Sequence, residues 1–396
     1  MKNRFAEFYE LSDIQIKDIW KNSLIVFDTN VLLNLYRYND STRDEFFKVI
    51  RFYKNRLWIP YQVGLEFHKR REEIIRKNAS AYELLGDKLT EQLLKSVDAL
   101  SSERDFARHP YIDMGHIKSK IKRCSESIAK SLKQQGKEHP DYSKKDNILS
   151  TITELFAGKV GEDFVENDLE NLYKEGEKRY SNEVPPGYCD EKNKKEKSKR
   201  SLYGDLIVWK QTIRYSSEQK RNVIFVTDDH KKDWWDKIDG KHSPRKELIK
   251  EFKDSTGQDV LIYDSSRFLE YAKRNKVLAI SQKMINEVEK IQIADITRQM
   301  DEMNRSILGI PNLYGLGDTI NSINKLYHPL SSYGLLSNTS YLDDWRETVL
   351  RVDGLAKIDE FIERLQRFKD MGVSLNKQLT TNKEKDGTIE DKITSE

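Results

Sequence analysis

Two short apolar runs that each end in acidic residues are the feature that most constrains the fold of this chain. Leu24–Phe27 leads directly into Asp28-Thr29-Asn30, and Val223–Val226 leads into Thr227-Asp228-Asp229. Short runs rich in β-branched residues are typical of buried strands in a parallel sheet. In open α/β sheets the ligand crevice lies at the carboxyl ends of the strands. The two runs therefore predict a metal and phosphate site at one edge of a sheet.

The composition excludes several classes of protein. Of the 396 residues 34% are charged and the mean hydropathy is −0.77, yet the net charge is only +3. Any affinity for nucleic acid must therefore come from local basic patches. The two cysteines, Cys124 and Cys189, exclude a disulfide framework. No apolar run approaches the length that spans a membrane and no apolar leader follows Met1, so we expect a cytoplasmic protein without a membrane partner.

The spacing of apolar residues predicts regions of different character. An α/β domain, with a central and mainly parallel sheet between helical layers, is expected over residues 20–275. Residues 79–183 are polar with helical spacing and should form a helical insertion, and residues 189–200 form a lysine-rich basic loop. Helices are expected over residues 276–375, followed by a disordered polar tail over 376–396.

Four acidic positions in the α/β region each have a reason to reach the same sheet edge. Asp28 and the Asp228-Asp229 pair follow strands. Glu66 lies one turn into a helix that follows a short strand, and Asp205 opens a helix directly after Gly204. Clustered carboxylates repel one another unless a cation offsets their charge, and a hard divalent cation prefers oxygen ligands. The four positions therefore predict a site for Mg²⁺ or Mn²⁺.

Each acid taken alone also has a purely structural interpretation. Asp28 could cap the helix that follows it, and Asp205 could respond to a helix dipole. Glu66 could be a solvated helix residue, and Asp228-Asp229 could belong to a turn. The recurrence of acids at four such places favours the functional interpretation.

The arrangement resembles the PIN-domain nuclease superfamily, and within it a bacterial PIN-like subgroup with a long helical insertion. The resemblance covers roughly residues 20–275 and includes nothing after residue 276. The segments that carry it are Phe27-Asp28-Thr29-Asn30, Trp58-Ile59-Pro60 leading to Glu66, Pro185-Pro186-Gly187-Tyr188, Gly204-Asp205-Leu206, Val226-Thr227-Asp228-Asp229 and Asp233-Trp234-Trp235.

The resemblance implies a three-layer α/β/α domain and a metal-dependent phosphodiesterase that acts on RNA more often than on DNA. Carried over by position, the metal-binding acids would be Asp28, Glu66, Asp205 and Asp229, with Asp228 as an additional or alternative ligand. Asn30 and Thr227 would hold the carboxylates or the attacking water by hydrogen bonds. The implied cofactor is Mg²⁺ or Mn²⁺, and the implied function is an endoribonuclease, with a toxin or anti-phage defence role compatible with it.

Other functions stay open at this point. A nuclease directed at DNA fits the same acids. A haloacid-dehalogenase-type phosphatase is disfavoured, because its general acid would stand where this chain has Asn30. A non-catalytic interaction protein could work through the amphipathic helices after residue 276, whose apolar faces need a homo-oligomer or another protein to cover them.

Overall fold

The computed structural model describes the chain except for residues 2–4, 10, 191–197, 239–240, 276–277 and 309–396. The chain divides into two compact units, residues 1–234 with 245–296, and residues 235–244 with 297–396. The predicted C-terminal region begins within the described residues as one long helix, but most of it, and the predicted tail, lie outside them. None of the described helices is both long and apolar enough to cross a lipid bilayer.

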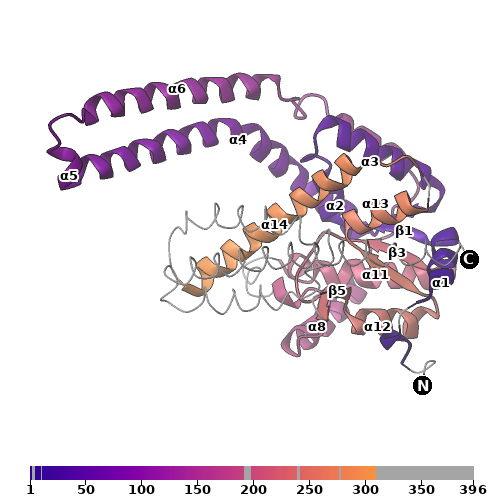
Figure 1. Cartoon of the computed structure of the whole chain (residues 1–396). Helices are drawn as coiled ribbons and strands as arrows, with labels where there is room; N and C mark the ends of the chain where they lie inside the picture. Colours follow the sequence, from indigo (N-terminus) through magenta and orange to yellow (C-terminus); the bar gives the residue numbers. More distant parts are fainter. Residues whose placement is uncertain (2–4, 10, 191–197, 239–240, 276–277, 309–396) are drawn as a thin grey trace, which may run out of the picture. The chain divides into compact units, whose positions relative to one another are not determined.

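The described secondary structure runs in the following order along the chain (Figure 1): η1 (Ala6–Phe8), α1 (Asp13–Asn22), β1 (Leu24–Phe27), α2 (Thr29–Asn34), α3 (Asp40–Phe52), η2 (Lys54–Arg56), β2 (Leu57–Trp58), α4 (Tyr61–Ser102), α5 (Arg104–Ala107), α6 (Met114–Glu138), α7 (Asn147–Leu155), α8 (Glu166–Ser181), η3 (Tyr188–Asp190), α10 (Lys199–Leu202), α11 (Gly204–Gln219), β3 (Val223–Val226), β4 (Trp235–Ile238), β5 (Lys241–Pro244), α12 (Lys246–Thr256), β6 (Val260–Tyr263), α13 (Ser265–Arg274) and α14 (Gln282–Leu308).

The sheet of the first unit confirms the predicted α/β class. Its strand order is β2-β1-β3-β6, and all three pairings are parallel. Phe27 at the end of β1 pairs with Val226 at the end of β3, and every residue of both strands is buried. The two predicted acid-bearing strands are thus neighbours in register, so Asp28 and Thr227 leave the sheet side by side.

Helices cover both faces of this sheet. Phe27 packs against Phe46 of α3 and Phe268 of α13, with ring centroids 6.4 and 5.5 Å away. Phe225 pairs with the residue before Phe27, so its side chain lies on the opposite face, where it packs against Trp209 of α11 at 6.2 Å. The three-layer α/β/α arrangement predicted for this domain is therefore confirmed.

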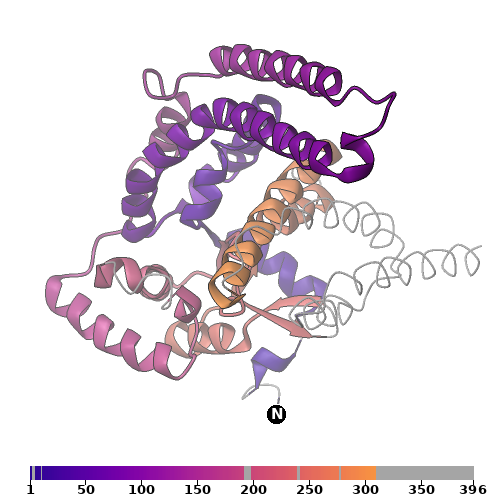
Figure 2. The same ribbon diagram turned by 90° about the vertical axis from the view of Figure 1, so that its left-hand side faces the viewer.

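A long helical hairpin begins before residues 79–183, the segment predicted to be a helical insertion, and forms its first part; α7 and α8 follow within the same segment. α4 is one continuous helix of 42 residues, and α6 runs back along it after α5; both views show α4 and α6 side by side (Figures 1 and 2). The same helix that carries Glu66 therefore also forms the first half of the hairpin. The chain returns to the sheet at Val160, which forms a parallel bridge with Ile59.

The second unit contributes one described feature that the sequence did not predict. β4 and β5 form an antiparallel hairpin in which Trp235 pairs with Pro244. The tryptophan before it, Trp234, belongs to the first unit, where its ring stacks on Phe225 with centroids 5.2 Å apart.

Candidate active site

Asp28 is held in one orientation at the carboxyl end of β1. It is the N-cap of α2, and one carboxylate oxygen accepts the backbone N–H of Thr29 at 2.6 Å. The other oxygen accepts Asn30 Nδ2 at 2.8 Å and Thr227 Oγ1 at 2.7 Å. The capping interpretation of Asp28 therefore describes a real interaction, but the cap uses only one of three hydrogen bonds.

Asn30 and Thr227 join the ends of β1 and β3. Asn30 Nδ2 also donates to Thr227 Oγ1 at 3.1 Å, and Asn30 Oδ1 accepts the backbone N–H of Asp228 at 2.9 Å. Thr227 Oγ1 in turn accepts the backbone N–H of Asp229 at 3.1 Å. The amide and the hydroxyl thus brace Asp28 against the two acids that follow β3.

The carboxyl of Asp28 is electrostatically strained by its surroundings. Burial raises its pKa to about 6, and the negative charges of Glu66 and Asp229 act in the same direction. The hydrogen bonds from Thr227 and Thr29 oppose this increase but do not cancel it. Carboxylates from β1, α4 and the end of β3 therefore gather closely enough to destabilise one another's charge.

Glu66 projects toward the start of α11. Its Oε1 accepts Gln62 Nε2 at 2.8 Å. A Cβ atom on Gly204 would lie only 2.5 Å from the same oxygen, so a larger residue at position 204 would displace the Glu66 carboxylate. Because Asp205 follows Gly204 in the first turn of α11, the glycine lets the helix that carries Asp205 approach Glu66.

Two residues that the sequence did not single out fix the orientation of Glu66. Arg200 Nε donates to Gln62 Oε1 at 2.8 Å, so the amide group of Gln62 faces Glu66. Arg200 also pairs with Asp163 at 2.7 Å, and Gln62 is only 2% exposed. Gln62 lies one helical turn before Glu66 on the same helix face, and this spacing is the signal that could have identified it.

A loop and a tyrosine cluster hold the start of α11. Gly187 has φ of +93°, and a Cβ atom there would lie 3.1 Å from the Cβ of Asp205. Its backbone N–H and that of Cys189 donate to Oδ2 of the buried Asp233 at 2.9 and 3.2 Å. The segment after Pro186 is therefore fixed against the first turn of α11 by the carboxylate of Asp233, a residue that the sequence marked only as part of the Asp233-Trp234-Trp235 segment, without a role.

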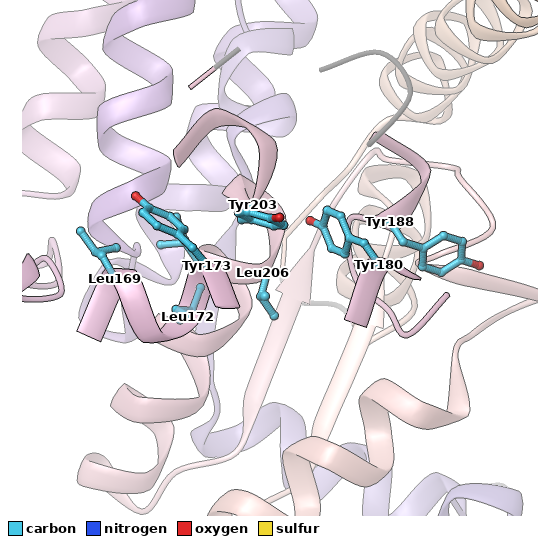
Figure 3. Close-up of a cluster of buried hydrophobic side chains, with 8 residues drawn as sticks. Leu169, Leu172, Tyr173, Tyr180, Tyr188, Tyr203 and Leu206 are labelled. Carbon is cyan, nitrogen blue, oxygen red and sulfur yellow. The ribbon is translucent and has the colours of Figure 1, made fainter. Parts of the chain in front are cut away.

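The tyrosine cluster packs α8 onto the residues around Gly204. Tyr203 lies between Tyr173 and Tyr180, with ring centroids 5.8 and 5.0 Å away (Figure 3). Leu206 on the first turn of α11 is completely buried in the same cluster. Asp205 therefore emerges from a rigid apolar base and not from a free helix end.

The two acids after β3 have different environments. Asp229 accepts Lys231 Nζ at 2.7 Å and the Lys231 backbone N–H at 3.0 Å, and its charge acts on Asp28. Asp228 is 6% exposed and accepts four hydrogen bonds, from Asn34 Nδ2 at 3.0 Å, the N–H and Oγ of Ser265 at 2.9 Å each, and Gln292 Nε2 at 2.7 Å. Both carboxylate oxygens of Asp228 thus accept hydrogen bonds from protein donors on α2, α13 and α14.

The donor chemistry of this cluster fits a hard divalent cation. Its charged groups are carboxylates, and the raised pKa of Asp28 is the effect that a bound cation would reverse. Among the residues that the structure describes, no three His, Cys, Asp or Glu side chains already stand in an arrangement that could hold an ion. A cation would therefore have to draw these carboxylates closer together.

Comparison with known proteins identifies a family for this part of the chain. A family model described as a PIN-like domain matches residues 24–248, more than half of the chain. No curated protein and no solved structure matches the chain significantly. The matched span begins with β1 and includes every predicted site residue.

Proposed function

This chain belongs to the PIN-like domain family, and we propose that it is a metal-dependent nuclease that hydrolyses phosphodiester bonds. PIN domains form a nuclease superfamily. The observation that carries the proposal is the half-buried Asp28, whose carboxylate is held by three hydrogen bonds and whose pKa is raised to about 6 by desolvation and by the nearby Glu66 and Asp229. A cluster of this kind is costly for folding and is typical of a functional site.

The residues proposed to hold Mg²⁺ or Mn²⁺ are Asp28, Glu66, Asp205 and Asp229. A divalent cation supplies Lewis-acid activation of water and offsets the charge of the phosphate. Asn30 and Thr227 fix the carboxylate of Asp28, and Gln62 fixes that of Glu66. To bind the cation, the carboxylate of Asp229 would give up one of its two hydrogen bonds from Lys231.

The proposed substrate is RNA, cut internally, and this preference rests on the family resemblance. A toxin or anti-phage defence effector in the cytoplasm is the role that we propose with it. The saturated carboxylate of Asp228 supports a structural role for this residue. We therefore place it outside the ligand set.

Cleavage assays test the proposal directly. Labelled single-stranded RNA, single-stranded DNA and duplex DNA are incubated with Mg²⁺, Mn²⁺ or EDTA and the wild-type protein, Asp28→Asn, Asp205→Asn or Asp87→Asn. Asp87 is an exposed acid on α4 and serves as the matched control. We expect metal-dependent cutting that falls about 100-fold or more in the two site variants, because loss even of outer-shell partners of a metal costs about 10–100-fold.

The preferred strand in this assay decides between RNA and DNA. Cutting that persists in both site variants would contradict the assignment of the acids. Metal binding in calorimetry without turnover on any strand would instead favour a non-catalytic interaction protein.

A further inference from the structure

The hairpin of α4 and α6 is closely packed on its inner face. A Cβ atom on Gly86 of α4 would lie 3.2 Å from the Cα of Ala129 on α6, and one on Gly136 of α6 would lie 3.3 Å from Tyr82. Ser125 of α6 is completely buried in this contact. These contacts fix which face of α6 is turned toward α4 from Ser125 to Gly136, and the opposite face points away from α4.

The two helices of the hairpin differ strongly in charge. α4 contains seven Lys and Arg and seven Asp and Glu, whereas α6 contains seven Lys and Arg against two Glu. On α4, Lys77 and Lys95 pair with glutamates one turn away at 2.6 and 2.5 Å. The excess positive charge of the hairpin is thus concentrated on α6.

Four basic residues of α6 form what we call the outer stripe: Lys120, Arg123, Lys130 and Lys137. With about 3.6 residues per turn they lie within an arc of about 100°, on the side of the helix away from Ser125. All four are exposed, and no ion pair joins any of them to a carboxylate in the part of the chain that the structure describes. They extend over about 26 Å at about 1.5 Å per residue.

We propose that the outer stripe of α6 binds the sugar-phosphate backbone of single-stranded nucleic acid. Lysine and arginine without acidic partners neutralise phosphates and release counterions. The exposed Ser127 and Gln134 lie between the basic residues and add hydrogen-bond donors for phosphate oxygens. This inference rests on the proposed function, because it supplies a binding surface for the strand that the acid site would cut.

The composition of α6 favours nucleic acid over an anionic membrane. Helices that lie on membranes carry an apolar face with aromatic residues opposite their basic face. α6 contains no Phe, Tyr or Trp, and the face opposite the outer stripe packs against α4. The stripe therefore offers charge without an apolar surface that could enter lipid.

Binding of labelled single-stranded RNA by the full chain in EDTA tests this proposal. EDTA prevents metal-dependent cutting, so the assay reads binding alone. The test variant carries Lys120→Gln, Arg123→Gln, Lys130→Gln and Lys137→Gln. The matched control removes four exposed charges from α4 by Lys69→Gln, Lys77→Gln, Lys88→Gln and Lys95→Gln.

The salt dependence of binding gives the expected size of the effect. Each lost phosphate contact reduces the slope of log K against log salt by about 0.7 for a single strand. Loss of all four contacts therefore lowers the slope by about 3 and the affinity at about 0.1 M salt by several hundred-fold. The α4 control should keep the wild-type slope, and both variants should keep the wild-type circular dichroism spectrum.

Several outcomes would overturn the proposal. These are a wild-type protein that does not bind RNA, an unchanged slope in the α6 variant, and an equal decrease in the α4 control. An α6 variant that loses binding to anionic vesicles while retaining RNA binding would also overturn it. If the α6 variant loses RNA binding but no form of the chain cuts RNA or DNA with any metal, the hydrolytic function fails while the binding surface stands.

Discussion

Replacing Asp28 with asparagine should stabilise the metal-free protein at neutral pH while it removes a proposed metal ligand. Burial raises the pKa of Asp28 from 3.8 to about 6, so the folded state holds this proton more tightly than the unfolded state does. Between these two values the wild-type protein loses stability as the pH rises. The full loss is about 3 kcal/mol, at about 1.36 kcal/mol for each pKa unit.

The substitution removes this charge but weakens the hydrogen bonds around it. The introduced amide would keep Oδ1 as the acceptor for the Thr29 N–H and would present its NH2 group to Thr227 and Asn30. The Thr227 hydroxyl can turn to accept from this NH2 group, whereas Asn30 Nδ2 loses its acceptor on residue 28. The loss of about one hydrogen bond costs about 1 kcal/mol. The variant should therefore be more stable than the wild-type protein by about 2 kcal/mol at pH 8.

Guanidinium denaturation followed by tryptophan fluorescence in EDTA measures this difference. From pH 5 to pH 8 the advantage of Asp28→Asn should grow by about 1.4 kcal/mol, whereas the exposed control Asp87→Asn should show no such growth. Adding Mn²⁺ at about 100 times its dissociation constant should stabilise the wild-type protein by about 2.7 kcal/mol and the variant much less. A variant that is less stable than wild type at pH 8, or a difference that does not change with pH, would refute the idea that desolvation and neighbouring acids raise the pKa of Asp28.

Three further substitutions separate catalytic from structural contributions. Gly204→Ala places a Cβ atom against Glu66 Oε1. The rate of cleavage should therefore fall about 10-fold or more, while the free energy of unfolding changes by only about 1 kcal/mol. Cleavage kinetics and denaturant titrations of the same variant measure the two effects, and an equal loss of stability and activity would contradict this prediction. Asp228→Ala leaves four buried donors without their acceptor and should destabilise the protein by about 3–5 kcal/mol in denaturant titrations, and a change below about 1 kcal/mol would contradict its structural role. Glu251 is partly buried, which alone would raise its pKa, but hydrogen bonds and charge from Arg179 lower the pKa to about 2. Its stabilisation is present above the unfolded value of 4.5 and is lost toward pH 2, so Glu251→Gln should cost about 2–3 kcal/mol at pH 7 and clearly less at pH 3.5.

The sheet and its acidic edge could be predicted from the sequence because they depend on local patterns. Apolar runs such as Leu24–Phe27 bury both faces of a strand, and a parallel arrangement brings their ends to one edge whichever strands are neighbours. The β4–β5 hairpin could not be predicted, because Trp235–Ile238 has only four residues, with two adjacent charged residues between two apolar ones, and so lacks the alternation of a strand. A pattern that short occurs in strands, turns and helix ends alike.

The two residues that orient Glu66 could not be predicted from the sequence, for a different reason. Gln62 and Arg200 are polar residues of types that usually face solvent. They are brought together only when α4 meets the segment before α11, which lies 138 residues further along the chain. Burial created by such a distant contact leaves no periodic signal at either position. Only the spacing of one helical turn between Gln62 and Glu66 indicates that the two side chains interact.

The adjacent acids Asp228 and Asp229 show why a carboxylate at a strand end cannot be assigned from its position alone. Successive residues of an extended chain point to opposite sides, so one acid faces α13 and α14 while the other faces Asp28. The two roles are linked, because Asn30 accepts the backbone N–H of Asp228 and donates to the carboxylate of Asp28. The hydrogen bond from Gln292 of α14 thus ends on Asp228, in the same short segment after β3 that positions the proposed metal ligands. Stability and ligand placement share this segment, so Asp228, which we place outside the ligand set, is expected to be as necessary to the site as the acids proposed to bind the cation.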